Sequence, residues 1–158
     1  MFKHLLIPLD GSPLAEQALP VAMALAARFG RTVTLLRVAQ PPYVVTGIGG
    51  SVYAELALGM RDQIHEEAQA YLAAVRESLQ TADVDVRMQV AEGDPAADVI
   101  LQIVDELGVD TIVMSTHGRT GLSRWVFGSV AERVLRGASV PVLLIRAAAP
   151  APGGDDAA

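Results

Sequence analysis

The chain has 158 residues, of which 51% are hydrophobic, 4% aromatic and 19% charged. This length suits one domain with a full core and is short for two domains. The formal net charge of −6 excludes a protein whose whole surface binds nucleic acid or an anionic membrane, because clustered Lys and Arg recruit those partners. The absence of cysteine excludes a disulfide scaffold, a thiolate zinc site and a cysteine nucleophile.

Neither a membrane span nor an export signal is evident. The longest apolar stretch, residues 18–27, contains Pro20 and has about half of the ~20 residues that a membrane span needs. Near the N-terminus, residues 5–9 are shorter than the ~7–15 apolar residues of an export signal and lead directly into Asp10. We therefore expect a soluble, cytoplasmic protein that binds neither membranes nor nucleic acid.

Short β-rich runs alternate with longer helical patterns, which is typical of βαβ units around a parallel sheet. The runs predicted as strands are residues 3–9, 32–38, 84–90, 110–115 and 140–145. Four of them are nearly continuous apolar runs, as expected of strands covered on both faces. The third run, VDVRMQV, alternates apolar and polar residues, so we place it at an edge of the sheet.

The helical patterns have recognisable starts and faces. Ser12-Pro13 and Asp94-Pro95 each place an N-cap residue before a proline at the first helical position. Pro20 lies inside the first helical pattern, so we expect a bend there or a late helix start. In the second pattern, apolar residues recur every three or four positions and predict a helix that packs by one face. These residues are Met60, Ile64, Ala68, Tyr71, Leu72, Val75 and Leu79.

Two segments lie outside these patterns. Residues 40–51 carry two prolines and three glycines and form the one long internal loop, and such loops are usually functional or mobile. Residues 147–158 have nothing to bury, so we expect a domain over residues 1–146 and a disordered tail over 147–158.

Doubly wound parallel sheets bind ligands beyond the C-terminal ends of their strands, where the strand order reverses. The segments at such ends are residues 8–12 (PLDGS), 38–40 (VAQ) and 114–121 (MSTHGRTG). The last of these continues to Gly128-Ser129, which opens another helix. Glycines let the backbone turn tightly near a ligand, and a helix N-terminus offers free N–H donors to an anion.

Charge favours an anion at the same place. Between Ser115 and Arg136, four arginines accompany one glutamate, a local charge of +3 that leaves −9 for the rest of the chain. A basic segment beside a glycine-rich turn predicts a polyphosphate site. It is no Walker loop, because GxxxxGK[ST] is absent and Lys3 is the only lysine. We assign no catalytic residue, since no G-x-S-x-G, no H-E-x-x-H and no carboxylate pair accompanies the site.

Two side chains at the site each admit two interpretations. Asp10 either caps the turn into the first helix through Gly11, or contacts a ribose hydroxyl or a magnesium ion. Ser129 and Glu132 form S-x-x-E, so the serine hydroxyl either caps its helix or binds phosphate. Among the arginines, Arg119 lies inside the turn and is the best candidate ligand, whereas Arg124, Arg133 and Arg136 suit a solvated or ion-paired surface.

Residues 114–146, MSTHGRTGLSRWVFGSVAERVLRGASVPVLLIR, resemble the C-terminal signature of the universal stress protein family, and residues 4–19 resemble its first strand and helix. Nucleotide-binding members of that family carry a glycine, two residues, a glycine, nine residues, a glycine and then Ser or Thr. Gly118, Gly128 and Ser129 match this pattern, and Ser115 replaces the first glycine. The extra Cβ and hydroxyl of Ser115 either weaken nucleotide binding or add a hydrogen bond.

The resemblance implies a single doubly wound α/β domain of the Rossmann-like, adenine nucleotide alpha hydrolase-like class, with five parallel strands in the order 3-2-1-4-5. It implies bound ATP. From its position at the end of the first strand, Asp10 is the candidate ligand of an Mg²⁺ ion bound through the phosphates. The residues it places around the nucleotide are Pro8, Leu9, Asp10, Val38, Met114, Ser115, Gly118, Arg119, Gly128, Ser129 and Val130.

The last strand, Val140 to Ile145, is long and apolar for an exposed edge, and such an edge normally finds a partner. The resemblance likewise implies a homodimer joined through it. We expect an ATP-binding stress-response or signalling protein with little or no catalytic turnover. The alternatives are a dimeric interaction module that no longer binds nucleotide, and a slow ATPase.

Overall fold

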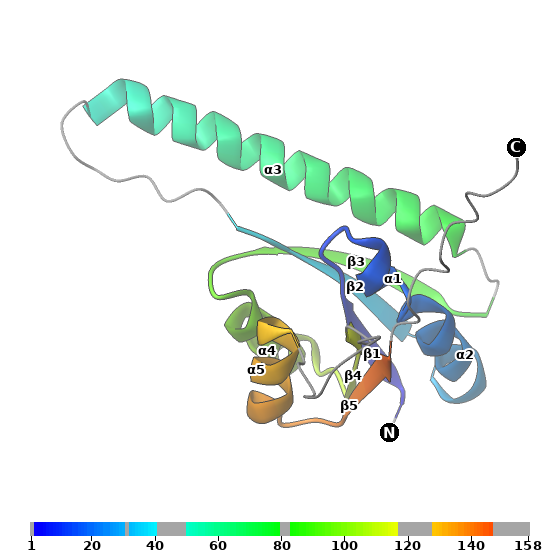
Figure 1. The fold of residues 1–158 in the computed structure, drawn as a ribbon. Helices are drawn as coiled ribbons and strands as arrows, with labels where there is room; N and C mark the ends of the chain where they lie inside the picture. The colour runs from blue at the N-terminus through cyan, green and yellow to red at the C-terminus, as the bar shows by residue number, and fades with distance from the viewer. Residues whose placement is uncertain (1, 31, 41–49, 80–82, 117–127, 147–158) are drawn as a thin grey trace, which may run out of the picture.

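The computed structural model describes residues 2–30, 32–40, 50–79, 83–116 and 128–146. Helices and strands alternate along the chain (Figure 1). In chain order they are β1 (His4–Pro8), α1 (Pro13–Glu16), α2 (Leu19–Phe29), β2 (Thr32–Ala39), α3 (Gly50–Ser78), β3 (Asp85–Glu92), α4 (Ala96–Leu107), β4 (Thr111–Thr116), α5 (Ser129–Gly137) and β5 (Val142–Arg146).

The five strands form one parallel sheet in the order β3-β2-β1-β4-β5. In Figure 1, α4 and α5 lie together on one face of the sheet, and α1 and α2 lie on the other. This arrangement confirms the predicted fold class and strand order. It also confirms the third run as an edge strand, β3, in which Asp85 and Arg87 are exposed.

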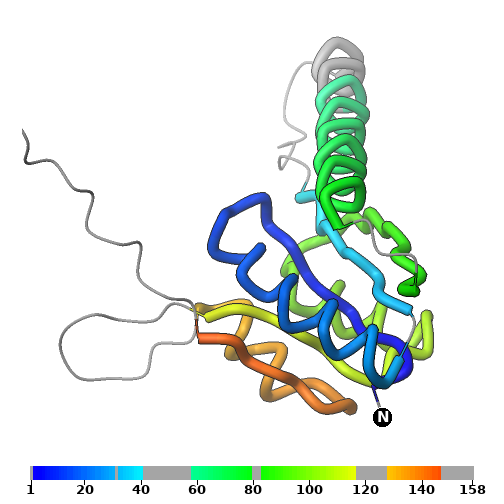
Figure 2. Tube along the Cα trace, turned by 90° about the vertical axis from the view of Figure 1, so that its right-hand side faces the viewer, coloured from blue at the N-terminus to red at the C-terminus, as the bar shows by residue number. Residues whose placement is uncertain are grey.

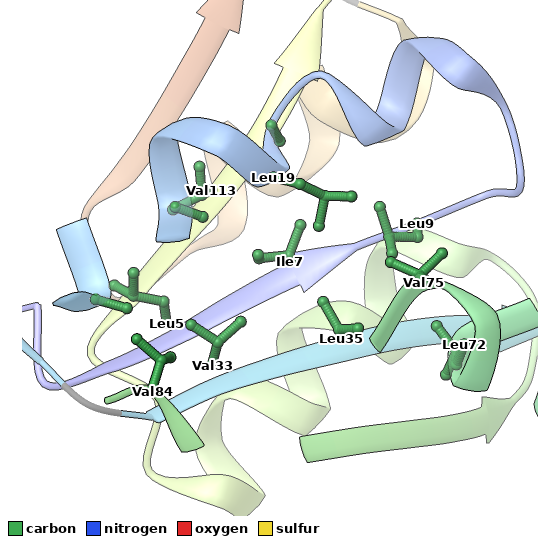
Figure 3. Close-up of a cluster of buried hydrophobic side chains, with 13 residues drawn as sticks. Leu5, Ile7, Leu9, Leu19, Val33, Leu35, Leu72, Val75, Val84 and Val113 are labelled. Carbon is green, nitrogen blue, oxygen red and sulfur yellow. The ribbon is translucent and has the colours of Figure 1, made fainter. Parts of the chain in front are cut away.

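Each face of the sheet carries its own hydrophobic cluster. On the α2 face, Leu5 and Ile7 belong to one cluster with Leu35 and with Leu72 of α3 (Figure 3). On the α4 face, Leu6 packs with other buried residues from β2, α4, β4 and α5. Leu5, Leu6 and Ile7 are all fully buried, which explains why the strand is a continuous apolar run rather than an alternating one.

The first helical pattern starts as predicted and is interrupted as predicted. Ser12 is the N-cap of α1, and its Oγ accepts a hydrogen bond from the backbone N–H of Ala15 at 3.1 Å. The chain then leaves the helix after Glu16 and begins α2 at Leu19, so that Pro20 falls within the first turn. A proline there removes no intrahelical hydrogen bond. Of the two predicted outcomes, a bend at Pro20 or a late helix start, the structure shows the late start.

The predicted start of α4 is wrong by one residue. Pro95 is the N-cap, in extended conformation with a ψ of 144°, and the helix begins at Ala96. Asp94 therefore lies one position too early to cap the helix. Its carboxylate accepts a hydrogen bond from the Gln40 side chain at 2.7 Å instead, which ties the end of β2 to the β3–α4 connection.

Helix α3 packs along only part of its length. Ala68, Leu72 and Val75 are buried as predicted, whereas Met60 is 44% exposed. Figures 1 and 2 show α3 extending past the sheet toward its N-terminal end, and residues 58–63, where the description of its side chains begins, are all exposed. Including Met60 in the packing face was therefore wrong. The helix also begins at Gly50, inside the segment predicted as a loop.

None of the helices in the described ranges has the length and apolar character to cross a membrane. Residues 41–49 of the predicted loop and the predicted tail, residues 147–158, lie outside the part of the chain that the structure describes.

Candidate nucleotide site

A cavity of about 830 Å³ opens beyond the C-terminal ends of β1, β2 and β4. The chain order reverses between β1 and β4, so the cavity occupies the switch point of the sheet, where ligands of such folds bind. Its walls come from the β1–α1 connection, the ends of β2 and β4, one side of α3, and the first turns of α4 and α5. Its volume lies within the range of small-molecule sites.

The structure brings the predicted nucleotide residues together. Those that it describes all line the cavity: Pro8, Leu9, Asp10, Val38, Met114, Ser115, Gly128, Ser129 and Val130. The other two, Gly118 and Arg119, lie outside the described residues.

Asp10 lies in a tight turn at the end of β1. Its Oδ1 accepts hydrogen bonds from the backbone N–H of Ser12 at 2.9 Å and from the Ser12 hydroxyl at 2.6 Å. The turn requires Gly11, whose φ of 84° is in the left-handed region. Partial burial alone would raise the pKa of Asp10, but the two bonds from Ser12 and the Arg37 cation outweigh it, so the pKa lies below its ordinary value. The carboxylate at the cavity is therefore ionised at neutral pH.

Ser115 directs its hydroxyl toward α1. The Oγ lies 2.5 Å from the carbonyl oxygen of Leu14 and 3.1 Å from that of Ala15, so it donates to the end of this short helix. The serine at the first motif glycine therefore adds a hydrogen bond within the protein, while its effect on nucleotide affinity stays a prediction. That bond connects β4 to α1 across the switch point.

The first turn of α5 also reaches the cavity. Gly128 is the N-cap and Ser129 the first helical residue, and no side chain of the described residues caps this end. The predicted capping box is therefore wrong, because Ser129 lies one residue too late, and Glu132 accepts from Arg136 at 2.7 Å instead. The leading N–H groups of a helix lack intrahelical partners, so those of α5 are available to an anion.

Arg133 and Arg136 behave as the predicted ion-paired surface residues. Arg133 pairs with Asp98 of α4 at 2.7 Å, and Arg136 pairs with Glu132 within its own helix. Arg124, like Arg119, lies outside the described residues.

Sequence reasoning missed Arg37, the one basic residue among the described cavity residues. Its Nη1 donates to the Leu9 carbonyl oxygen at 3.3 Å, and its guanidinium carbon lies 5.8 Å from the centroid of the Tyr71 ring. A signal existed, because Arg37 is the single charged residue of the strand TVTLLRVA and stands near its C-terminal end.

The wall formed by α3 was also missed. Ile64, Glu67, Ala68 and Tyr71 line the cavity, and the Tyr71 hydroxyl donates to Glu16 of α1 at 2.8 Å. Burial, followed by this bond to a carboxylate, raises the pKa of Tyr71, so the phenol stays protonated. The helical pattern of α3 held no signal for this wall, since its place over the end of β2 follows from tertiary packing.

The model of the universal stress protein family matches residues 1–146. The chain belongs to the universal stress protein family. Universal stress protein MJ0531 of Methanocaldococcus jannaschii is 33% identical over 149 residues, which cover 92% of this chain and 83% of that protein. Universal stress protein MJ0577 of the same organism is 29% identical over 157 residues, covering 92% and 96% of the two chains.

Solved universal stress protein structures share the fold. The structure of MJ0577 superposes with a TM-score of 0.77 at 28% identity and covers 95% of this chain and 99% of its own. A family member from Arabidopsis thaliana with AMP bound has a TM-score of 0.64 at 19% identity, covering 97% of each chain. A universal stress protein in complex with cAMP has a TM-score of 0.56 at 20% identity, covering 90% and 96%.

The residues of this universal stress protein suit an adenine nucleotide. Leu36, Val38, Ile100 and Met114 give the cavity an apolar wall for a base, and the first turn of α5 offers N–H groups to phosphate. A resident metal has less support. No group of three or more His, Asp or Glu residues gathers within the described ranges. Asp10 alone suits Mg²⁺ only where nucleotide phosphates supply the other ligands.

Proposed function

We propose that this protein binds ATP in the cavity and acts as a nucleotide-dependent stress-response or signalling protein with little or no catalytic turnover. The observation that carries the proposal is one cavity at the switch point that combines an apolar wall with the N-terminus of α5, which no side chain of the described residues caps. The AMP and cAMP bound by two proteins of the same fold support an adenine nucleotide as the ligand.

In this proposal, each part of the cavity holds one part of the nucleotide. Pro8, Leu9 and Val38 lie around the adenine, and Asp10 accepts from a ribose hydroxyl. Met114, Ser115, Gly118 and Arg119 lie around the ribose and phosphates. Gly128, Ser129 and Val130 lie under the phosphates. In the alternative role of Asp10, its carboxylate holds Mg²⁺ together with those phosphates and does not accept from the ribose hydroxyl.

Gly128→Val tests the proposal. The new side chain stands at the N-cap of α5 and obstructs the approach of phosphate, so ATP affinity should fall by about tenfold or more. Gly59→Ala is the matched control, because Gly59 lies on α3 and a Cβ there meets nothing within 4 Å. Equal ATP affinities of wild type and Gly128→Val would place the nucleotide elsewhere or nowhere.

Ser115 at the first motif glycine favours a second candidate, a dimeric interaction module that no longer binds nucleotide. The two candidates differ in what the purified protein contains. Mass analysis of the native protein should reveal a retained adenine nucleotide in the first case and the bare chain in the second. A slow ATPase is the third candidate, and phosphate release above blank that disappears in Asp10→Ala would support it.

We also propose a cytoplasmic homodimer joined through β5. The side chains of Val142, Leu143, Leu144 and Ile145 are only half-buried at this edge of the sheet, although all four are apolar. A second copy of the strand would cover them and supply partners for the outer backbone groups.

A further inference from the structure

The chain segment that carries Asp10 is held from both neighbouring strands. Arg37 of β2 donates to the Leu9 carbonyl oxygen at 3.3 Å on one side. Ser115 of β4 donates to the carbonyl oxygens of Leu14 and Ala15 on the other side. The sheet order places β1 between these two strands. The two side chains therefore form hydrogen bonds with the chain on both sides of Asp10, one just before it and one a few residues after it.

Arg37 is itself fixed in place. Its guanidinium carbon lies over the ring of Tyr71, 5.8 Å from the centroid, and the Tyr71 hydroxyl donates to Glu16 of α1 at 2.8 Å. A Cβ on Gly11 would lie 3.5 Å from the Arg37 Nη1, so the guanidinium also lies close to the turn. A planar guanidinium held at a cation–π distance from an aromatic ring loses little further conformational freedom when it donates a hydrogen bond.

We propose that Arg37 and Ser115 are positioning residues that fix the β1–α1 connection from its two sides and thereby set Asp10 for a ribose hydroxyl. The proposal rests on the proposed nucleotide site. A hydrogen bond to an ionised carboxylate depends strongly on geometry, and a pre-set acceptor avoids the ordering cost that a mobile turn would add on binding. The positive charge of Arg37 also favours the ionised form of the Asp10 carboxyl. A second acidic residue, Glu67, lines the same cavity.

The first measurement is the mobility of the β1–α1 connection in nucleotide-free protein, followed by NMR relaxation of the backbone N–H groups of Gly11 and Ser12. Arg37→Met keeps the apolar stem and removes the donor to the Leu9 carbonyl oxygen, so both groups should become more mobile. Arg87→Met is the matched control, because Arg87 pairs with Asp85 on β3 and does not line the cavity. Unchanged mobility of Gly11 and Ser12 in Arg37→Met would overturn the role of Arg37.

The second measurement is the preference for ATP over 2′-deoxy-ATP, taken as the ratio of the two dissociation constants. Arg37→Met and Ser115→Ala should each reduce this ratio by about threefold to fivefold, the equivalent of one weakened hydrogen bond. Asp10→Asn should remove most of the preference, and adding Arg37→Met to it should change the ratio no further. Arg87→Met should leave the ratio at its wild-type value.

The outcomes separate the two proposals. If Arg37→Met and Ser115→Ala weaken ATP and 2′-deoxy-ATP equally, neither residue acts through Asp10, and the positioning role is wrong. If the wild type binds neither nucleotide, the proposed function is wrong, while the mobility of Gly11 and Ser12 still decides whether Arg37 fixes the β1–α1 connection. Where Arg37→Met fails to fold, Arg37→Lys decides. Replacing the planar guanidinium fork with a single ammonium group should increase this mobility and lower the ribose preference.

Discussion

At the scale of single residues, Ser115 shows how the fold accommodates a serine where the motif has a glycine. Its hydroxyl donates to the last turn of α1, so Ser115→Ala should lower the free energy of unfolding by about 1 kcal/mol. Ser139→Ala is the control, because the Ser139 hydroxyl is exposed and 3.4 Å from Asp105. Urea denaturation measures both variants. Equal losses of unfolding free energy in Ser115→Ala and Ser139→Ala would mean that the hydrogen bonds of Ser115 stabilise the fold no more than the exposed bond of Ser139.

Asp10 makes a pH-dependent contribution to stability. Although partial burial opposes ionisation, the two bonds from Ser12 and the charge of Arg37 lower its pKa in the folded state. The ionised carboxylate therefore stabilises the fold above its unfolded pKa of about 4, and this contribution is lost as the pH falls through the lower folded value. Unfolding free energies of wild type and Asp10→Asn should differ by a constant amount from about pH 5 to 7 and converge below about pH 4. A difference that stays constant down to pH 3 would contradict this linkage.

Arg37 and Asp94 illustrate how much of a residue's role can be predicted from the sequence alone. A lone cation in an apolar strand was visible in the sequence, but its contact with Tyr71 depends on α3 crossing the end of β2. Asp94-Pro95 and Ser12-Pro13 look equivalent as motifs, yet only Ser12 caps its helix. Asp94 bonds the side chain of Gln40, a partner 54 positions away that no local pattern indicates.

At the scale of elements, α3 combines a packed segment with an exposed one. Gly59 lies among the exposed residues 58–63, and a Cβ added there meets nothing within 4 Å. Gly59→Ala should therefore raise the free energy of unfolding by about 0.5–1 kcal/mol through helix propensity alone. Urea denaturation tests this. A decrease in stability would show that position 59 needs its glycine.

The two edge strands differ in their expected partners. Leu144→Lys on β5 should convert the proposed dimer to a folded monomer, because a charge enters the apolar edge that a second copy would cover. Val86→Lys places the same charge at the opposite edge, on β3, and should leave the dimer intact. Sedimentation at micromolar concentration distinguishes the two, with circular dichroism as the check of folding. A wild type that sediments as a clean monomer would remove the proposed interface.

Elements were predictable where local chemistry sets them. The alternating run of β3 indicated an edge strand, as the sheet confirms. The apolar run of β1 indicated a buried strand but not its place in the sheet, because the run of the edge strand β5 is equally apolar. The exposure of Met60 was not predictable, since periodicity shows which residues share a face of a helix and says nothing about how far its neighbour extends.

At the scale of the whole molecule, the structure changes the interpretation of the basic segment, residues 115–136, whose composition predicted that its arginines attract phosphate. The net charge of −6 hides a local charge of +3 between residues 115 and 136. In the structure, Arg133 and Arg136 are paired with Asp98 and Glu132, so these two arginines offer little free charge to a phosphate. In the described part of the site, the groups that attract an anion are the N–H groups at the start of α5 and the guanidinium of Arg37.

A calorimetric titration of the nucleotide-free protein with ATP and Mg²⁺ tests the central claim most directly. The cavity at the switch point predicts saturable binding of one ATP per chain at submillimolar concentration. The absence of any binding heat at millimolar ATP, at two temperatures so that a vanishing enthalpy is not mistaken for no binding, would contradict it.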